Sequence, residues 1–162
     1  MPSLLDPFFD AMDAEFDGKS WNARALMPTL DSLSASEAAS EATWEGYSAW
    51  SVALHVAKCK RIVAIDLGGP APDWPYAEEP WFPAPADPSD AGWARDRALA
   101  RSCHDACMKA LRSMPESRLK ETMPSWKAPW DKVIAWLVTH DSFHGAQLRS
   151  MGLPSLKEKK HE

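Results

Sequence analysis

Two histidines near the C-terminal end of the chain are four residues apart, His140 and His144. If the segment is helical, they lie on one face about one turn apart, within the apolar stripe that should face the core. A buried imidazole without a partner is costly, so two of them on such a stripe need partners. Their ring nitrogens could converge on one metal ion. Alternatively, each could be a core histidine bonded to a backbone group or a carboxylate.

A third histidine, His55, shifts the balance between these two interpretations. It lies in the middle of another predicted helix, on an apolar stripe with Val52 and Ile62. Three neutral imidazoles leave a tetrahedral ion one open position, which is typical of catalytic rather than structural zinc. We therefore predict that His55, His140 and His144 bind one divalent metal ion.

Three side chains close to the histidines in sequence are candidates for supporting roles. Cys59, four residues after His55, could be a fourth ligand that closes the site, or a small buried apolar residue, and we favour the second. Asp141 points roughly 100° away from His140 around the helix. We expect it to form a salt bridge at the helix edge, with a hydrogen bond to a ligand histidine as the alternative. Gln147 lies on the interior face, and we predict that it orients His144 or a metal-bound water.

The elements that must position these residues follow from apolar spacings of three and four, which indicate helices with one buried face. Four segments show this spacing: residues 5–33, interrupted near Gly18, then 50–67, 90–114 and 129–151. Ser48 is a candidate N-cap of the second, and Pro115 ends the third. The sequence thus predicts an all-α fold, a four-helix bundle, as one domain over residues 1–153, with a solvated C-terminal tail at 154–162.

A proline-rich segment, residues 69–88, separates the second and third predicted helices. It holds seven of the fourteen prolines together with Trp74, Trp81 and Phe82. Its length excludes a tight connection between antiparallel neighbours. We predict a long Pro/Trp-rich crossover packed along the bundle; a lid over an active site is the alternative.

Composition and charge exclude several classes of function. The 162 residues carry a net charge of −5 with scattered lysines and arginines, which argues against nucleic-acid or anionic-membrane partners. The N-terminal residues include acids and lack the basic start of a signal peptide, and no run approaches the ~20 apolar residues of a membrane span. With three cysteines and no export signal, we expect a cytoplasmic protein. The nine tryptophans are compatible with a homodimer.

Three motifs give the chain a resemblance to a known family. They are FDGKSW (Phe16–Trp21), YSAWSVALHVA (Tyr47–Ala57) and HDSFHGAQL (His140–Leu148). In these motifs the chain resembles the DinB-like family of metal-binding four-helix bundles. The resemblance implies that His55, His140 and His144 bind a divalent metal, usually zinc or nickel, and it implies the chemistry of the family's thiol-dependent S-transferases and isomerase. Asn22, Ser51 and Cys59 depart from the family pattern near the expected pocket and leave the substrate open.

The hypothesis that follows is a metal-dependent enzyme with a small-molecule substrate. A bound cation would activate water or a low-molecular-weight thiol at its open position, because coordination lowers the pKa of the ligand. The first alternative is a non-enzymatic stress-response bundle, in which the metal only stabilises folding. The second is a metal-free bundle with satisfied core histidines.

Overall fold

The computed structural model describes residues 3–78 and 81–157, and this part of the chain is helical without a β-strand. The prediction of an all-α chain is confirmed. The helices are α1 (Asp6–Asp17), α2 (Leu26–Asp31), α3 (Ala35–Ala39), α4 (Ala49–Asp66), α5 (Asp90–Ser113) and α6 (Trp130–Ser150), with 3-10 helices η1 (Glu116–Lys120) and η2 (Pro154–Leu156). None of these helices is long and apolar enough to cross a membrane.

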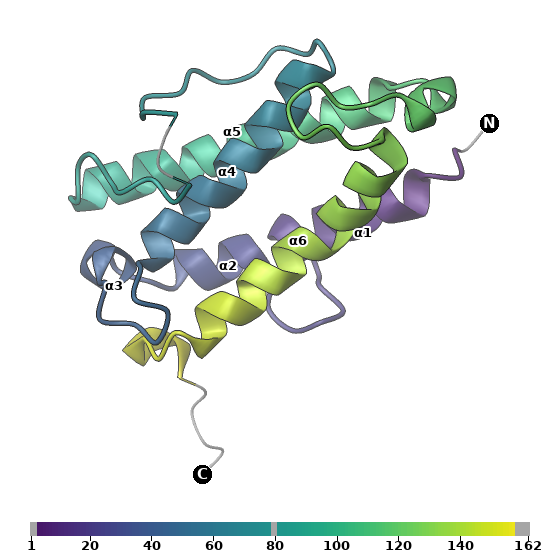
Figure 1. Cartoon of the computed structure of the whole chain (residues 1–162). Helices are drawn as coiled ribbons and strands as arrows, with labels where there is room; N and C mark the ends of the chain where they lie inside the picture. The colour runs from purple at the N-terminus through teal and green to yellow at the C-terminus, as the bar shows by residue number, and fades with distance from the viewer. Residues whose placement is uncertain (1–2, 79–80, 158–162) are drawn as a thin grey trace.

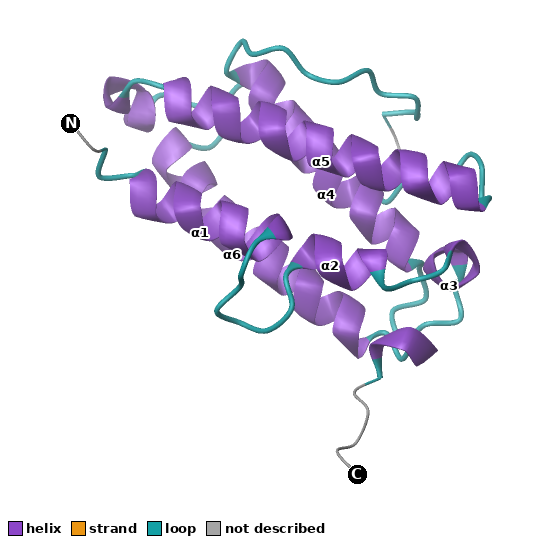
Figure 2. Ribbon diagram, turned by 180° about the vertical axis from the view of Figure 1, so that it is seen from behind, coloured by secondary structure: helices purple, strands orange, loops and turns teal. Residues whose placement is uncertain are grey.

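Two helix pairs form the body of the molecule (Figure 1). Helix α4 packs along α5, and α1 packs along α6, while α2 continues beyond α1 and also contacts α6 (Figure 2). The apolar faces of both pairs enclose the core, where Trp50 of α4 and Trp130 of α6 are fully buried. The pair α4 and α6, which carries the three histidines, is also in direct contact.

The ends of the long helices follow local sequence signals. The Ser48 side chain caps α4 by accepting a hydrogen bond from the Ser51 amide at 3.0 Å, as predicted. Ser89 caps α5 in the same way, through the Gly92 amide at 3.0 Å. Gly152 follows α6 with φ of +81°, a conformation that favours glycine and ends the helix.

The predicted helical segment over residues 5–33, interrupted near Gly18, is two separate helices, α1 and α2, joined by a loop. Glu15, at the end of α1, accepts hydrogen bonds from the Ser20 hydroxyl at 2.8 Å and the Asn22 amide at 3.0 Å, which shape the loop. The same carboxylate accepts from Ser142 of α6 at 2.8 Å. The loop is therefore tied to the helix that carries two of the histidines.

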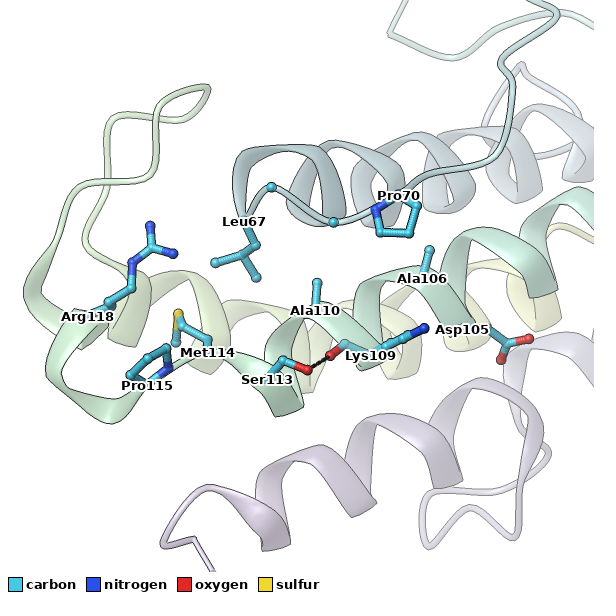
Figure 3. Close-up of a pocket in the computed structure, with 12 residues that line it drawn as sticks. Leu67, Pro70, Asp105, Ala106, Lys109, Ala110, Ser113, Met114, Pro115 and Arg118 are labelled. Atoms are coloured by element: carbon cyan, nitrogen blue, oxygen red, sulfur yellow. Dashed lines mark hydrogen bonds between the residues drawn. The ribbon is translucent and has the colours of Figure 1, made fainter.

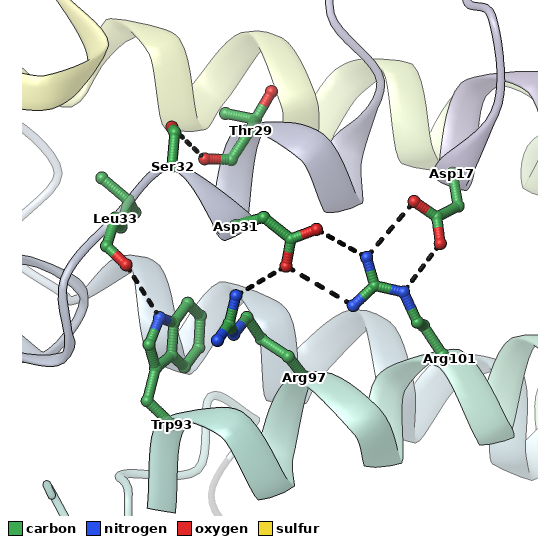
Figure 4. A network of polar contacts seen from close by, with 8 residues as sticks. All are labelled: Asp17, Thr29, Asp31, Ser32, Leu33, Trp93, Arg97 and Arg101. Carbon is green, nitrogen blue, oxygen red and sulfur yellow. Dashed lines mark hydrogen bonds and ion pairs between the residues drawn. The ribbon is translucent and has the colours of Figure 1, made fainter. Parts of the chain in front are cut away.

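Two arginines of α5 form ion pairs with the ends of α1 and α2, the two helices on either side of the break (Figure 4). Arg101 donates to Asp17, at the end of α1, at 2.7 Å and to Asp31, at the end of α2, at 2.6 Å. Arg97 also donates to Asp31, at 2.7 Å. These ion pairs hold α2 against α5, although a non-helical loop separates α2 from α1.

The connection between α4 and α5 is a packed crossover. The Arg61 guanidinium donates to the Pro72 carbonyl at 2.8 Å. The Tyr76 hydroxyl donates to Asp96, a fully buried carboxylate that also accepts from the Trp50 indole at 2.8 Å. Trp74 and Phe82 pack against the core as well. The crossover is thus fastened to α4 and α5 before it reaches the histidines.

The segment after α6 divides into two parts. Pro154–Leu156 forms η2, where the Ser155 amide and hydroxyl donate to Glu37 of α3 at 2.9 Å and 2.6 Å. Leu156 packs against the core. The predicted solvated tail begins at residue 154; Pro154, Ser155 and Lys157 are exposed, and the Ser155 hydrogen bonds hold this start of the tail to a residue more than a hundred positions away. Residues 158–162 lie outside the described residues.

Candidate metal centre

The structure brings the three predicted histidines together in the core. His55 comes from the middle of α4, and His140 and His144 from consecutive turns of α6; each is 3–4% exposed. The Nε2 atom of His140 lies 3.4 Å from Nε2 of His55 and 3.1 Å from Nε2 of His144. One nitrogen from each ring lies within 4.8 Å of the others. Three buried imidazoles at these distances could hold a metal ion.

Two of the three separations between these nitrogens are close to those around a tetrahedral ion. Nitrogen ligands bound at 2.0–2.1 Å to such an ion are ~3.3 Å from one another. The two measured Nε2 separations, 3.4 Å and 3.1 Å, lie on either side of that value. The donor set is also one that zinc and nickel accept.

A chain of hydrogen bonds fixes the tautomer of His144. The Glu45 carboxylate can only accept, so the Tyr47 hydroxyl donates to it, at 3.2 Å. The Tyr47 oxygen then accepts from the Gln147 amide nitrogen, which leaves Gln147 Oε1 facing His144 Nδ1 at 2.8 Å. Nδ1 must therefore donate, and Nε2 of His144 carries a lone pair directed at His140. Gln147, the sequence candidate for orienting His144, thus contacts its Nδ1, and its role in orienting a metal ligand stays a prediction.

Asp141 has the corresponding place beside His140. Its Oδ2 atom lies 2.7 Å from Lys60 Nζ, and both side chains are 1% exposed. Its Oδ1 atom is 3.8 Å from His140 Nδ1, and both of these buried atoms lack a hydrogen-bond partner. The expected salt bridge exists, but it lies in the core rather than at the helix edge, because Lys60 of α4 reaches across to α6. Burial raises the pKa of the Asp141 carboxyl, but Lys60 and His140 outweigh it and lower the pKa to about 2.

These contacts favour an arrangement in which two lone pairs face each other. A carboxylate beside Nδ1 favours the tautomer of His140 that is protonated there, in which Nε2 is unprotonated like that of His144. Two unprotonated nitrogens 3.1 Å apart repel unless a cation lies between them. The arrangement is that of metal ligands oriented by outer hydrogen-bond partners.

Burial also keeps two of the imidazoles, those of His55 and His144, neutral. It lowers the pKa of His55 to about 3 and that of His144 to about 4, and repulsion from the neighbouring histidines acts in the same direction. At neutral pH both rings therefore have the uncharged form that a metal ligand requires.

Cys59 lies beside the histidines without joining them. Its sulfur is 3.8 Å and 3.9 Å from the ring nitrogens of His55. It does not belong to the group of ligand atoms that lie within 4.8 Å of one another. Burial raises the pKa of its thiol to about 12, so the sulfur is protonated at neutral pH. These contacts suit a small buried apolar residue.

A cavity of about 300 Å³ opens onto the histidines. Its walls are Gln147 and five aromatic residues, Tyr47, Trp81, Phe82, Trp136 and Phe143. Sequence reasoning did not assign Tyr47, Trp136 or Phe143 to the site, and it placed Trp81 and Phe82 there only in the alternative of a lid over an active site. For Trp136 and Phe143 the sequence held a signal. Trp136 lies four residues before His140 and Phe143 lies three residues after it, and side chains at these spacings are neighbours on a helix. For Trp81 and Phe82 no local signal existed, because the crossover brings them to α4.

Comparison with known proteins gives the chain no relative. It matches no protein-family model, no curated protein and no solved structure. Function is therefore argued from the geometry of the site.

A second hollow, of about 370 Å³, lies where α4 ends beside α5 (Figure 3). Leu67, Ala110 and Met114 are among the apolar residues that line it. The Arg118 guanidinium at one end is paired with Glu121 at 2.8 Å. Asp105 is the one side chain of a type that can ligate a metal that lines this hollow among the described residues, so the hollow offers no cluster of ligands comparable to the three histidines.

Proposed function

We propose that this chain is a metal-dependent enzyme that binds one divalent ion, zinc or nickel, on His55, His140 and His144. Its reaction is the transfer of a low-molecular-weight thiol onto an electrophilic small molecule. The observation that carries the proposal is the convergence of three buried imidazoles, two of them with Nε2 atoms 3.1 Å apart, on an aromatic cavity. A bound ion would lower the pKa of a coordinated thiol or water, which supplies a nucleophile at neutral pH.

The arrangement of helices supports a DinB-like four-helix bundle as the framework. Helix α1 with its continuation α2 forms one member, and α4, α5 and α6 form the other three. The histidines come from the second and fourth members, in the order and at the separation of the family's motifs. The ligands therefore lie on long, packed helices, which hold them more rigidly than loops would.

The residues of the chain have distinct tasks in this reaction. His55, His140 and His144 hold the ion, while Gln147 and Asp141 face the Nδ1 atoms of His144 and His140. In the transfer, the thiol sulfur loses its proton to water and forms a bond to an electrophilic carbon. The bond from that carbon to its leaving group breaks, and the leaving group departs with the electron pair. The aromatic walls reduce access of bulk water to the reacting atoms.

A second candidate is a non-enzymatic bundle in which the ion only joins α4 to α6. The observation in its favour is the Cys59 sulfur, 3.8 Å from His55, which would close the coordination shell if it turned toward the ion. Removing this sulfur separates the two candidates. A structural site loses affinity without its fourth ligand, whereas an open site does not.

Elemental analysis of purified protein tests the metal site. We expect about one zinc or nickel ion per chain in the wild type, and loss of that ion in His55→Ala, His140→Ala and His144→Ala. Cys59→Ala is the matched control and should keep the ion. If the histidine variants retain the wild-type metal content, the site assignment is wrong.

Thiol consumption tests the enzymatic part. The metal-loaded protein should accelerate the reaction of a thiol with an alkylating electrophile, and the His144→Ala variant should not. Cysteine, glutathione and benzyl mercaptan are the thiols to test. If the metal-loaded protein does not accelerate the reaction of any of them with the electrophile, the site is structural.

A further inference from the structure

Three exposed aromatic side chains surround the histidines, one beside each ring. Trp81 is 61% exposed and its ring centre lies 4.8 Å from that of His55. Trp136 is 41% exposed and 4.2 Å from His140. Phe143 is 63% exposed and 5.1 Å from His144. We call Trp81, Trp136 and Phe143 the aromatic rim.

Exposure of the aromatic rim to water is energetically unfavourable unless a ligand covers it. Large apolar side chains in contact with water favour burial, at roughly 25 cal/mol per Å² of apolar surface. Single exposed residues are ordinary, but a group around one cavity indicates a binding site. Behind the rim, Tyr47 and Phe82 stack with ring centres 4.6 Å apart and form a continuous apolar wall.

Charge restricts the kind of ligand that this cavity accepts. Among the described residues no lysine, arginine, aspartate or glutamate lines it, and its lining consists of the histidines, Gln147 and aromatic side chains. The positive charge of a divalent ion would thus be uncompensated, which favours a ligand with one anionic donor atom. Aromatic rings can attract cations, but here the nearby metal ion would repel a positively charged group on the ligand.

Size gives the third restriction. A buried cavity of about 150 Å³ is known to accommodate a benzene molecule. The cavity here, about 300 Å³, has room for one ring together with a short arm and a donor atom.

We propose that the ligand of this site is a small molecule with one anionic donor atom, such as a thiolate, and an uncharged aromatic body held by the aromatic rim. This inference rests on the proposed metal site and adds the class of molecule that it selects. The donor atom would face the three histidines, and the body would lie between Trp81 of the crossover and Phe143 of α6.

Titration of Co²⁺-loaded protein with three thiols tests this selection. Thiolate binding to Co²⁺ gives a charge-transfer absorption band, so each dissociation constant is measured without turnover. We expect benzyl mercaptan to bind about tenfold or more tightly than 2-mercaptoethanol, because its ring is buried on binding. Cysteamine, which carries a cationic amine, should bind more weakly than both.

Rim variants show whether the preference comes from these side chains. Phe143→Ala and Trp81→Ala should each reduce the preference for benzyl mercaptan by about threefold or more while the Co²⁺ content is unchanged. Phe8→Ala and Trp44→Ala remove exposed aromatics that do not line the cavity, and they should keep the wild-type preference.

The outcomes separate this inference from the proposal on which it rests. If the wild type binds no Co²⁺, the metal site itself is refuted, and the ligand class with it. If the wild type binds Co²⁺ but the three thiols bind within about threefold of one another, the metal site stands and the ligand class is wrong. A preference that survives both rim substitutions also overturns the inference.

Discussion

At the scale of single residues, the protonation state of each imidazole depends on the contacts of its second nitrogen. Gln147 faces Nδ1 of His144 and Asp141 faces Nδ1 of His140, so the Nε2 atoms are free to act as ligands. His104 of α5 is a buried histidine outside this group. It stacks on Phe16 with ring centres 3.9 Å apart, and its Nε2 lies 2.8 Å from Asp13.

His104 should make the folded protein sensitive to acid. Burial lowers its pKa to about 4, below the ordinary value near 6.5, although Asp13 acts in the opposite direction. The unfolded chain therefore binds a proton first, so this contribution to stability is complete above pH 6.5 and is lost as the pH falls toward 4. From pH 7 to pH 4.5 the loss is up to about 2 kcal/mol. Urea unfolding of wild type and His104→Phe at both pH values measures it, and an equal loss in both proteins would contradict the assignment.

At the scale of elements, a buried ion pair joins the two helices that carry the histidines. Lys60 of α4 and Asp141 of α6 are paired at 2.7 Å, and the second oxygen of Asp141 faces His140. Replacing a buried ion pair by apolar residues of similar volume often leaves the stability of the fold unchanged or raises it. Stability alone therefore does not explain why this pair is present. Because the pair lies beside His140, we expect it to orient that ring.

The double variant Lys60→Met/Asp141→Leu separates packing from orientation. We expect its free energy of unfolding, measured in urea without metal, to equal or exceed that of the wild type. Its zinc affinity should fall about 10- to 100-fold, because His140 loses the group that fixes its tautomer. Competition with a zinc chelator measures the affinity. An unchanged affinity would mean that the ion pair contributes to packing alone.

At the scale of the whole molecule, the site connects the two helix pairs. Helix α4 packs mainly on α5, and α6 packs on α1 and α2. An ion shared by His55, His140 and His144 would therefore add a link between the pairs. The crossover approaches the same point from the other side, since both Trp81 and Phe82 contact His55.

Metal binding should therefore stabilise the entire fold. Free zinc at a hundredfold excess over its dissociation constant raises the free energy of unfolding by about 2.7 kcal/mol if the unfolded chain does not bind it. The melting temperature of the wild type should rise by several degrees on adding zinc and fall again with a chelator. His144→Ala should show neither change. Identical melting curves for the wild type with zinc and with chelator would exclude a bound ion.

Sequence alone determined the features that depend on local spacing. Apolar periodicity indicated the four long helices, Ser48 indicated where α4 begins, and the i, i+4 spacing placed His140 and His144 on one face. It did not indicate α3, whose five residues are too few to show a periodic stripe.

Only the tertiary structure decided the contacts between distant segments. It paired Lys60 with Asp141, brought Trp81 from the crossover to His55, and docked Ser155 on Glu37. A helix pattern specifies which face is buried but not which residue of another helix meets it. The candidate metal site itself depended on such a meeting, because His55 lies 85 positions from His140 and the packing of α4 against α6 sets the 3.4 Å between them.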